Sequence, residues 1–140
     1  MIPWGGWNTV DLNTGGRYCS GACASPIPAG TSTISVTKQG GRSLISWTAV
    51  SFAAAYDLVR GLVIELHNSG GNFTTSTQAC LANDQVTTSY LDSTAPPAAN
   101  GFWYLVRGLS CGGAGTYDEV GGSQVGSRDA EINASPSGCP

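Results

Sequence analysis

Short runs of alternating hydrophobic and polar residues, separated by glycine-rich turns, fill the chain from residue 31 to its end. Alternation with a period of two, rich in β-branched and aromatic residues, is typical of strands that bury one face. The pattern predicts seven strands, at residues 33–38, 43–48, 55–59, 62–67, 86–91, 102–107 and 127–134. No segment has a convincing amphipathic helical period. We therefore expect an all-β fold, an antiparallel β-sandwich of about seven strands.

The first 30 residues follow neither the strand nor the helix period. They contain Trp4, Trp7, Cys19 and Cys23 among many glycines, and they end in a Pro-Ile-Pro sequence. A segment of this length cannot bury a core by itself. We expect residues 1–30 to be an irregular extension and residues 31–140 to be one sandwich domain.

Two segments resemble a fibronectin type III domain. The segment SLISWTAVSFAAAYDLVRG resembles the hairpin of that family's strands B and C, with Trp47 and Tyr56 at its core tryptophan and tyrosine positions. The segment TSYLDSTAPPAANGFWYLVRGLS resembles strand E, the E–F corner and strand F, although Phe102 stands where the corner tyrosine usually lies. The C-terminal tail is similar to the endings of bacterial exported proteins with such domains. The resemblance implies a fold and leaves function open, because sandwiches of this type host many activities.

The alternation also predicts which side chains point outward from strands 55–59 and 102–107. The inward set is Tyr56, Leu58, Phe102, Tyr104 and Val106, and the outward set is Asp57, Val59, Trp103, Leu105 and Arg107. The resemblance implies that these strands are neighbours. We then expect Val59, Trp103 and Leu105 to form one exposed apolar patch, flanked by Asp57 and Arg107, which is typical of an interface. In the alternative interpretation, the N-terminal extension folds back and covers the patch.

The composition restricts the cellular compartment and the kinds of partner that we expect for the protein. The net charge is −3, charged residues make up 11% of the chain, and Lys38 is the single lysine. This excludes a nucleic-acid binder that neutralises phosphates with clustered cations. Five cysteines in 140 residues indicate an oxidising environment, so we expect a secreted or cell-surface protein, presumed bacterial from the resemblance. No apolar run is long enough to span a membrane, and no signal peptide is visible, which favours a mature fragment of an exported precursor.

Disulfides explain the cysteines better than zinc does, because the only close pair is C-x3-C and His67 is the single histidine. The resemblance implies that residues 70–83 and the F–G turn lie at the same end of the sandwich, which pairs Cys80 with Cys111. Cys19 and Cys23 can then close a small ring. Cys139 is left free or bonded to another chain, which would suit a covalent assembly. Alternatively, the extension gives Cys19 or Cys23 to Cys139.

Candidate catalytic patterns are weak. Residues 108–112 match G-x-S-x-G around Ser110, but the glycines that follow cannot begin the helix that a hydrolase needs, and His67 precedes the serine. We therefore expect a tight turn there, and Cys111 to be a half-cystine. Glu65 and Glu131 have no spacing that indicates a glycosidase pair. The pairs Asn83-Asp84 and Asp118-Glu119 lack a calcium-loop pattern. We expect no catalytic residues, no metal and no cofactor.

These observations favour a non-catalytic structural or adhesive module of an exported assembly, such as a subunit of a surface filament. It would bind a protein partner or a second copy through the apolar sheet face and through Trp4 and Trp7 of the extension. The alternative is a carbohydrate-binding or spacer module of a secreted multidomain enzyme, in which Trp103 stacks on a sugar of a polysaccharide. An enzyme in its own right is the least supported hypothesis.

Overall fold

The computed structural model of the chain describes residues 25–119, 121 and 124–140. Trp4, Trp7, Cys19 and Cys23 lie outside these residues, so the predictions about them stay predictions. The strands are β1 (Ile34–Gln39), β2 (Arg42–Trp47), β3 (Ala55–Leu62), β4 (Thr77–Gln85), β5 (Ser89–Asp92), β6 (Phe102–Ser110) and β7 (Gly113–Ala114). The helices are α1 (Val63–Asn68), α2 (Phe73–Ser76) and α3 (Arg128–Asn133).

The strands form two antiparallel sheets. One has the order β1-β2-β5, and the other has the order β4-β3-β6-β7. The predicted all-β sandwich is therefore confirmed, with three short helices added to it. The expected pairing of strands 55–59 and 102–107 is also found, because β3 pairs with β6 in a register that places Val59 opposite Leu105.

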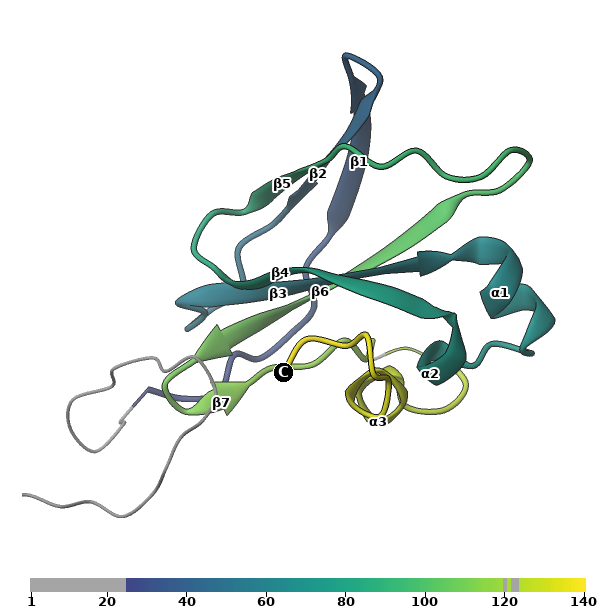
Figure 1. Cartoon of the computed structure of the whole chain (residues 1–140). Coiled ribbons are helices and arrows are strands. Elements are labelled where there is room, and N and C mark those ends of the chain that lie inside the picture. The colour runs from purple at the N-terminus through teal and green to yellow at the C-terminus, as the bar shows by residue number, and fades with distance from the viewer. Residues whose placement is uncertain (1–24, 120, 122–123) are drawn as a thin grey trace, which may run out of the picture.

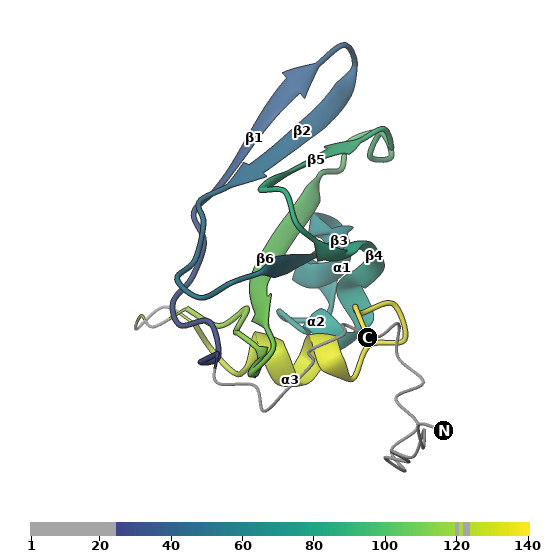
Figure 2. The same cartoon turned by 90° about the vertical axis from the view of Figure 1, so that its left-hand side faces the viewer.

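The molecule has three layers (Figures 1 and 2). The three-stranded sheet lies above the four-stranded sheet, and α2, α3 and the C-terminal segment lie below it. β3 is central in its sheet and is covered on both faces, so all eight of its residues are buried. The hairpin of β1 and β2 extends beyond the four-stranded sheet at one end.

In the core between the two sheets, Trp47, Tyr56, Leu58 and Val106 lie where the sequence predicted them, whereas Val50 and Ala82 lie outside the predicted strands. The buried cluster is Ile45, Trp47, Val50, Tyr56, Leu58, Ala82 and Val106. The Trp47 and Tyr56 rings meet edge to face at 5.7 Å, and the Tyr56 hydroxyl accepts a hydrogen bond from the Val50 backbone N–H. Phe102 and Tyr104 are half-buried.

Two predicted strands are wrong, because the structure has helices there. The alternation at 62–67 continues past the end of β6, which begins at Phe102 opposite Leu62 and so offers no further pairing. The chain forms α1 instead, and Gly101 O accepts from the first helical N–H, that of Val63. The predicted strand at 127–134 is α3, which Ser127 caps by accepting from the Ala130 N–H.

Two strands were not predicted. β4 has the sequence TQACLANDQ, which is poor in β-branched residues, and its register with β3 shifts three times. The second, β7, is only two residues long. The strand expected at 86–91 is present only as Ser89–Asp92.

Candidate functional site

The predicted interface on β3 and β6 is not exposed. Val59 is fully buried, in a second apolar cluster with Tyr117, Ile132 and Cys139, and Trp103 and Leu105 are half-buried against that cluster. The alternation therefore assigned these side chains to the correct face of the sheet. The prediction of an exposed patch is wrong, because the chain after β7 returns across this face. Within the described residues the cover is the C-terminal segment.

A disulfide fastens this cover to the sheet. Cys139 is bonded to Cys80, with the Cα atoms 4.9 Å apart. The predicted pair Cys80–Cys111 is wrong, because Cys80 lies within β4 opposite Val59 and not in an end loop. The prediction that Cys139 is free or bonded to another chain is also wrong, as is its alternative pairing with the extension. Cys111 is itself disulfide-bonded.

Asp57 and Arg107 form a buried ion pair under the same cover. Arg107 Nη2 lies 2.9 Å from Asp57 Oδ2, and Arg107 Nη1 donates to Asn133 Oδ1 at 3.0 Å. The guanidinium also lies 4.8 Å from the centre of the Tyr117 ring. Burial raises the pKa of Asp57 in spite of the Arg107 charge. Arg107 is therefore an anchor for the C-terminal segment, and the prediction that it flanks an exposed interface is wrong.

The β1 edge remains open. β1 pairs only with β2 in its sheet, and five of its six residues are exposed. Thr48 N donates to Thr33 O, which marks these two residues as a hydrogen-bonded pair. Because such pairs alternate along an antiparallel ladder, the backbone N–H and C=O groups of Ile34, Val36 and Lys38 point away from β2, along the free edge.

Val36 shows that the inner face beside this edge is also uncovered. It lies opposite Ile45, which is 0% exposed, and it shares that residue's face, yet Val36 is 51% exposed. The hairpin of β1 and β2 extends beyond the four-stranded sheet (Figures 1 and 2), and β7 pairs only with Leu109 and Ser110 at the end of β6. Among the described strands, none pairs with the rest of β6 on its β7 side.

The chain after β7 leaves the sheet because side chains satisfy its backbone donors. Asp118 Oδ1 accepts from the Arg128 N–H at 2.6 Å, and Asp129 Oδ1 accepts from the Tyr117 N–H at 2.7 Å. These bonds join residues 117 and 118 to the beginning of α3, so these two residues do not continue β7. We name the outer edge of β1, at Ile34, Val36 and Lys38, the open edge.

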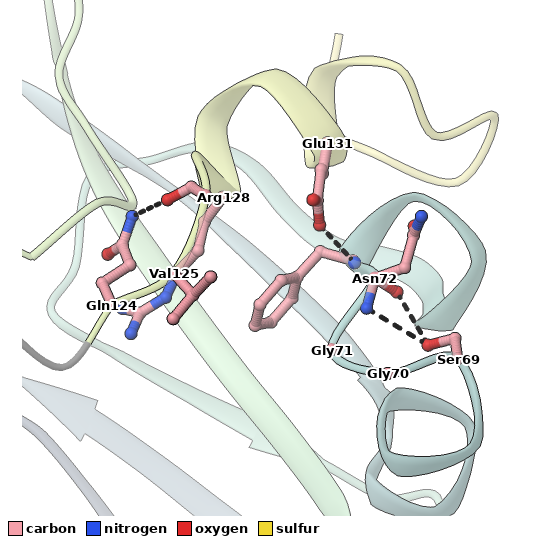
Figure 3. A pocket seen from close by; sticks show the side chains of 10 residues that line it. Ser69, Gly70, Gly71, Asn72, Gln124, Val125, Arg128 and Glu131 are labelled. Carbon is pink, nitrogen blue, oxygen red and sulfur yellow. Dashed lines mark hydrogen bonds between the residues drawn. The ribbon is translucent and has the colours of Figure 1, made fainter.

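The second candidate site, after the open edge, is a cleft of 480 Å³, which Figure 3 shows from close by. The loop from α1 to α2 forms one side, and the segment leading into α3 forms the other. The lining residues are Ser69, Gly70, Gly71, Asn72, Phe73, Gln124, Val125, Gly126, Arg128 and Glu131. No sequence pattern indicates this cleft, because its two sides are about 50 residues apart in the chain.

The other residues that the sequence singled out lie apart from one another. Ser110 ends β6 in a tight turn, where its hydroxyl donates to Pro26 O at 2.9 Å and accepts from the Gly112 N–H at 3.0 Å. His67 and Glu65 are on α1, and Glu131 is on α3. In the part of the chain that the structure describes, no group of three or more His, Cys, Asp or Glu side chains could hold a metal ion. Nor does any described helix have the length and apolar character needed to cross a membrane.

Comparisons with known proteins add little. No family model matches the chain, and no curated protein matches it significantly. Among solved structures, the chain is similar to a protein from Clostridium thermocellum described as Fn3-like, with 23% sequence identity and a TM-score of 0.44. That match covers 64% of this chain and 83% of the other. The fold assignment therefore depends on the strand order and registers given above.

Proposed function

We propose that the protein is a non-catalytic structural module of an exported assembly and that it associates through the open edge. The observation that carries this proposal is the free side of β1, with Val36 uncovered beside it. Exposed strand edges pair readily with other strands, and proteins that avoid this protect them with prolines, inward charges, bulges or short edge strands. β1 is six residues long with the sequence ISVTKQ. Its one charge, Lys38, is on the same face as Val36 but lies next to the turn, so Ile34 and Val36 have no such protection.

The partner that this edge fits is a second copy of the chain. An antiparallel pair with Val36 opposite its own copy keeps both inner faces on one side of a continuous sheet. In that register Lys38 of one copy lies opposite Ile34 of the other, so no like charges face each other. The residues that pair are those whose backbone groups point outward in each copy.

This pairing makes a closed dimer, and a filament needs a second contact. The first 24 residues, with Trp4 and Trp7, are our candidate for that contact on the basis of their sequence. Val59, Trp103 and Leu105 are not part of either contact, because the C-terminal segment covers them. The Cys80–Cys139 disulfide supports an oxidising, extracellular location.

Proline at the edge tests the proposal. The Val36 N–H is not bonded to β2, so Val36→Pro removes a donor from the open edge and keeps the β1–β2 ladder. Val36→Thr is the matched control, because it keeps the N–H and the β-branched shape. We expect sedimentation velocity to show concentration-dependent association of the wild type and of Val36→Thr, weakened at least about tenfold in Val36→Pro. A wild type that stays monomeric at all concentrations, or equal association of both variants, contradicts the proposal.

The alternative function, a carbohydrate-binding module, cannot use Trp103 as its stacking ring. That side chain packs against Phe73 and the covered cluster, with ring centres 5.1 Å apart. A sugar site on this molecule therefore has to lie elsewhere.

A further inference from the structure

The cleft between the α1–α2 loop and the segment before α3 has a fixed frame. Ser69 Oγ accepts from the Asn72 N–H and donates to Leu66 O. On the opposite side, Gln124 Nε2 donates to Asp118 Oδ1 and to Gly126 O (Figure 3 shows the second bond). Both side chains use their polar groups in hydrogen bonds within the loops. They therefore shape the cleft and leave little hydrogen-bonding capacity for a ligand.

The backbone donors at the rim are also used. Glu131 Oε2 accepts from the Phe73 N–H at 2.6 Å, and Asn72 Oδ1 accepts from the Thr75 N–H. The Arg128 N–H is bonded to Asp118. A carboxylate or amide already fills the place where an anion would bind to these N–H groups, so the cleft is poorly suited to a phosphate or a carboxylate.

Three polar groups of the lining keep unused hydrogen-bonding capacity. Arg128 donates through Nη1 to Tyr117 O at 3.3 Å and has further N–H groups without a partner among the described residues. Within the same residues, Glu131 Oε1 and Asn72 Nδ2 have no hydrogen-bond partner. The Arg128 guanidinium lies 6.0 Å from the centre of the half-buried Phe73 ring, which also lines the cleft.

We propose that this cleft binds a neutral carbohydrate. A sugar hydroxyl both donates and accepts, and here an unused carboxylate oxygen accompanies unused guanidinium and amide donors. The charges of Arg128 and Glu131 offset each other, which favours an uncharged ligand. The Phe73 ring offers an apolar surface for the C–H face of a sugar, and 480 Å³ lies within the roughly 300–1,000 Å³ of small-molecule sites.

This site is independent of the open edge. Phe73 of α2 and Arg128 and Glu131 of α3 line the cleft, and both helices lie under the four-stranded sheet, whereas β1 belongs to the other sheet (Figure 1). A dimer formed through β1 would leave both clefts accessible. Loss of either activity therefore says nothing about the other.

Affinity gel electrophoresis tests the site with soluble polysaccharides in the gel: hydroxyethylcellulose, xylan and galactomannan as neutral probes, and polygalacturonate as an acidic one. We expect at least one neutral probe to retard the full chain and Arg128→Gln to lose at least about tenfold in affinity for it. Arg42→Gln is the matched control, because Arg42 is exposed on β2, away from the cleft. Equal thermal midpoints for the two variants show that folding is not the cause.

Three outcomes overturn the proposal. The first is no retardation by any neutral probe. In the second, Arg128→Gln and Arg42→Gln are retarded equally. The third is retardation by polygalacturonate alone, which contradicts the inference that the cleft takes an uncharged ligand.

Discussion

Asp57 and Arg107 are charged residues that lie in the interior of the molecule, with their side chains 1% and 7% exposed. Their charges made the outer face of β3 and β6 look solvated in the sequence. The alternation correctly assigned each side chain to one face of the sheet. It could not show that a segment about 20 residues further along the chain covers that face, since a period of two carries no information about the next layer.

The ion pair gives the first prediction. Arg107→Met leaves the Asp57 carboxylate buried without its partner, and it removes the bond to Asn133 on α3. We expect the free energy of unfolding to fall by about 3 kcal/mol in urea titrations. Arg42→Met, on the exposed end of β2, is expected to change it by less than about 0.5 kcal/mol. A small effect of Arg107→Met contradicts the assignment of Arg107 as an anchor.

Tyr104 gives a prediction at high pH. Burial, and then the charge of Asp92, raise the pKa of Tyr104 to about 12, and its hydroxyl donates to Asp92 Oδ2 at 3.1 Å. The unfolded chain releases this proton near pH 10, so the folded state binds more protons between pH 10 and about 12. Stability must therefore fall as the pH rises through that window.

The test compares the wild type with Tyr104→Phe in urea titrations between pH 9 and 11.5. The fall in stability is expected to be shallower in the variant, which cannot ionise at this position. Equal slopes for the two proteins argue against a raised pKa at Tyr104.

The sequence contains a helix signal for α3 but none for α1. Ser127 followed by Asp129 and Glu131 is a helix start signal, and it lies at the beginning of α3. In contrast, α1 follows from tertiary structure, because β6 gives β3 no partner beyond Leu62. β4 has weak intrinsic strand preference and takes its conformation from pairing with β3.

The Cys80–Cys139 disulfide links the C-terminal segment covalently to β4. Removing this disulfide is expected to destabilise the C-terminal cover. The double variant Cys80→Ser/Cys139→Ser loses a link across 59 residues, which the chain-entropy model values at about 4 kcal/mol. We expect a lower thermal midpoint and increased binding of a hydrophobic dye, because Val59 and Trp103 become accessible when the cover detaches. An unchanged midpoint shows that the cover is held without the bond.

The open edge is a property of the whole molecule, and no pattern in the sequence predicts it. The strand pattern correctly located β1, β2 and the glycine turn between them, with positive φ at Gly40 and Gly41. Among the described strands only β2 pairs with β1, and the alternation along a strand carries no information about how many neighbours that strand has.

Amide hydrogen exchange along β1, measured at low and high protein concentration, tests the proposed association most directly. In the monomer, the Val36 and Lys38 amides face solvent, while Ser35 and Thr37 are bonded to β2. Association through the open edge predicts that Val36 and Lys38 gain protection as the concentration rises, while Ser35 and Thr37 are protected throughout. Protection that appears elsewhere, or no change at Val36 and Lys38 in associated protein, contradicts the account.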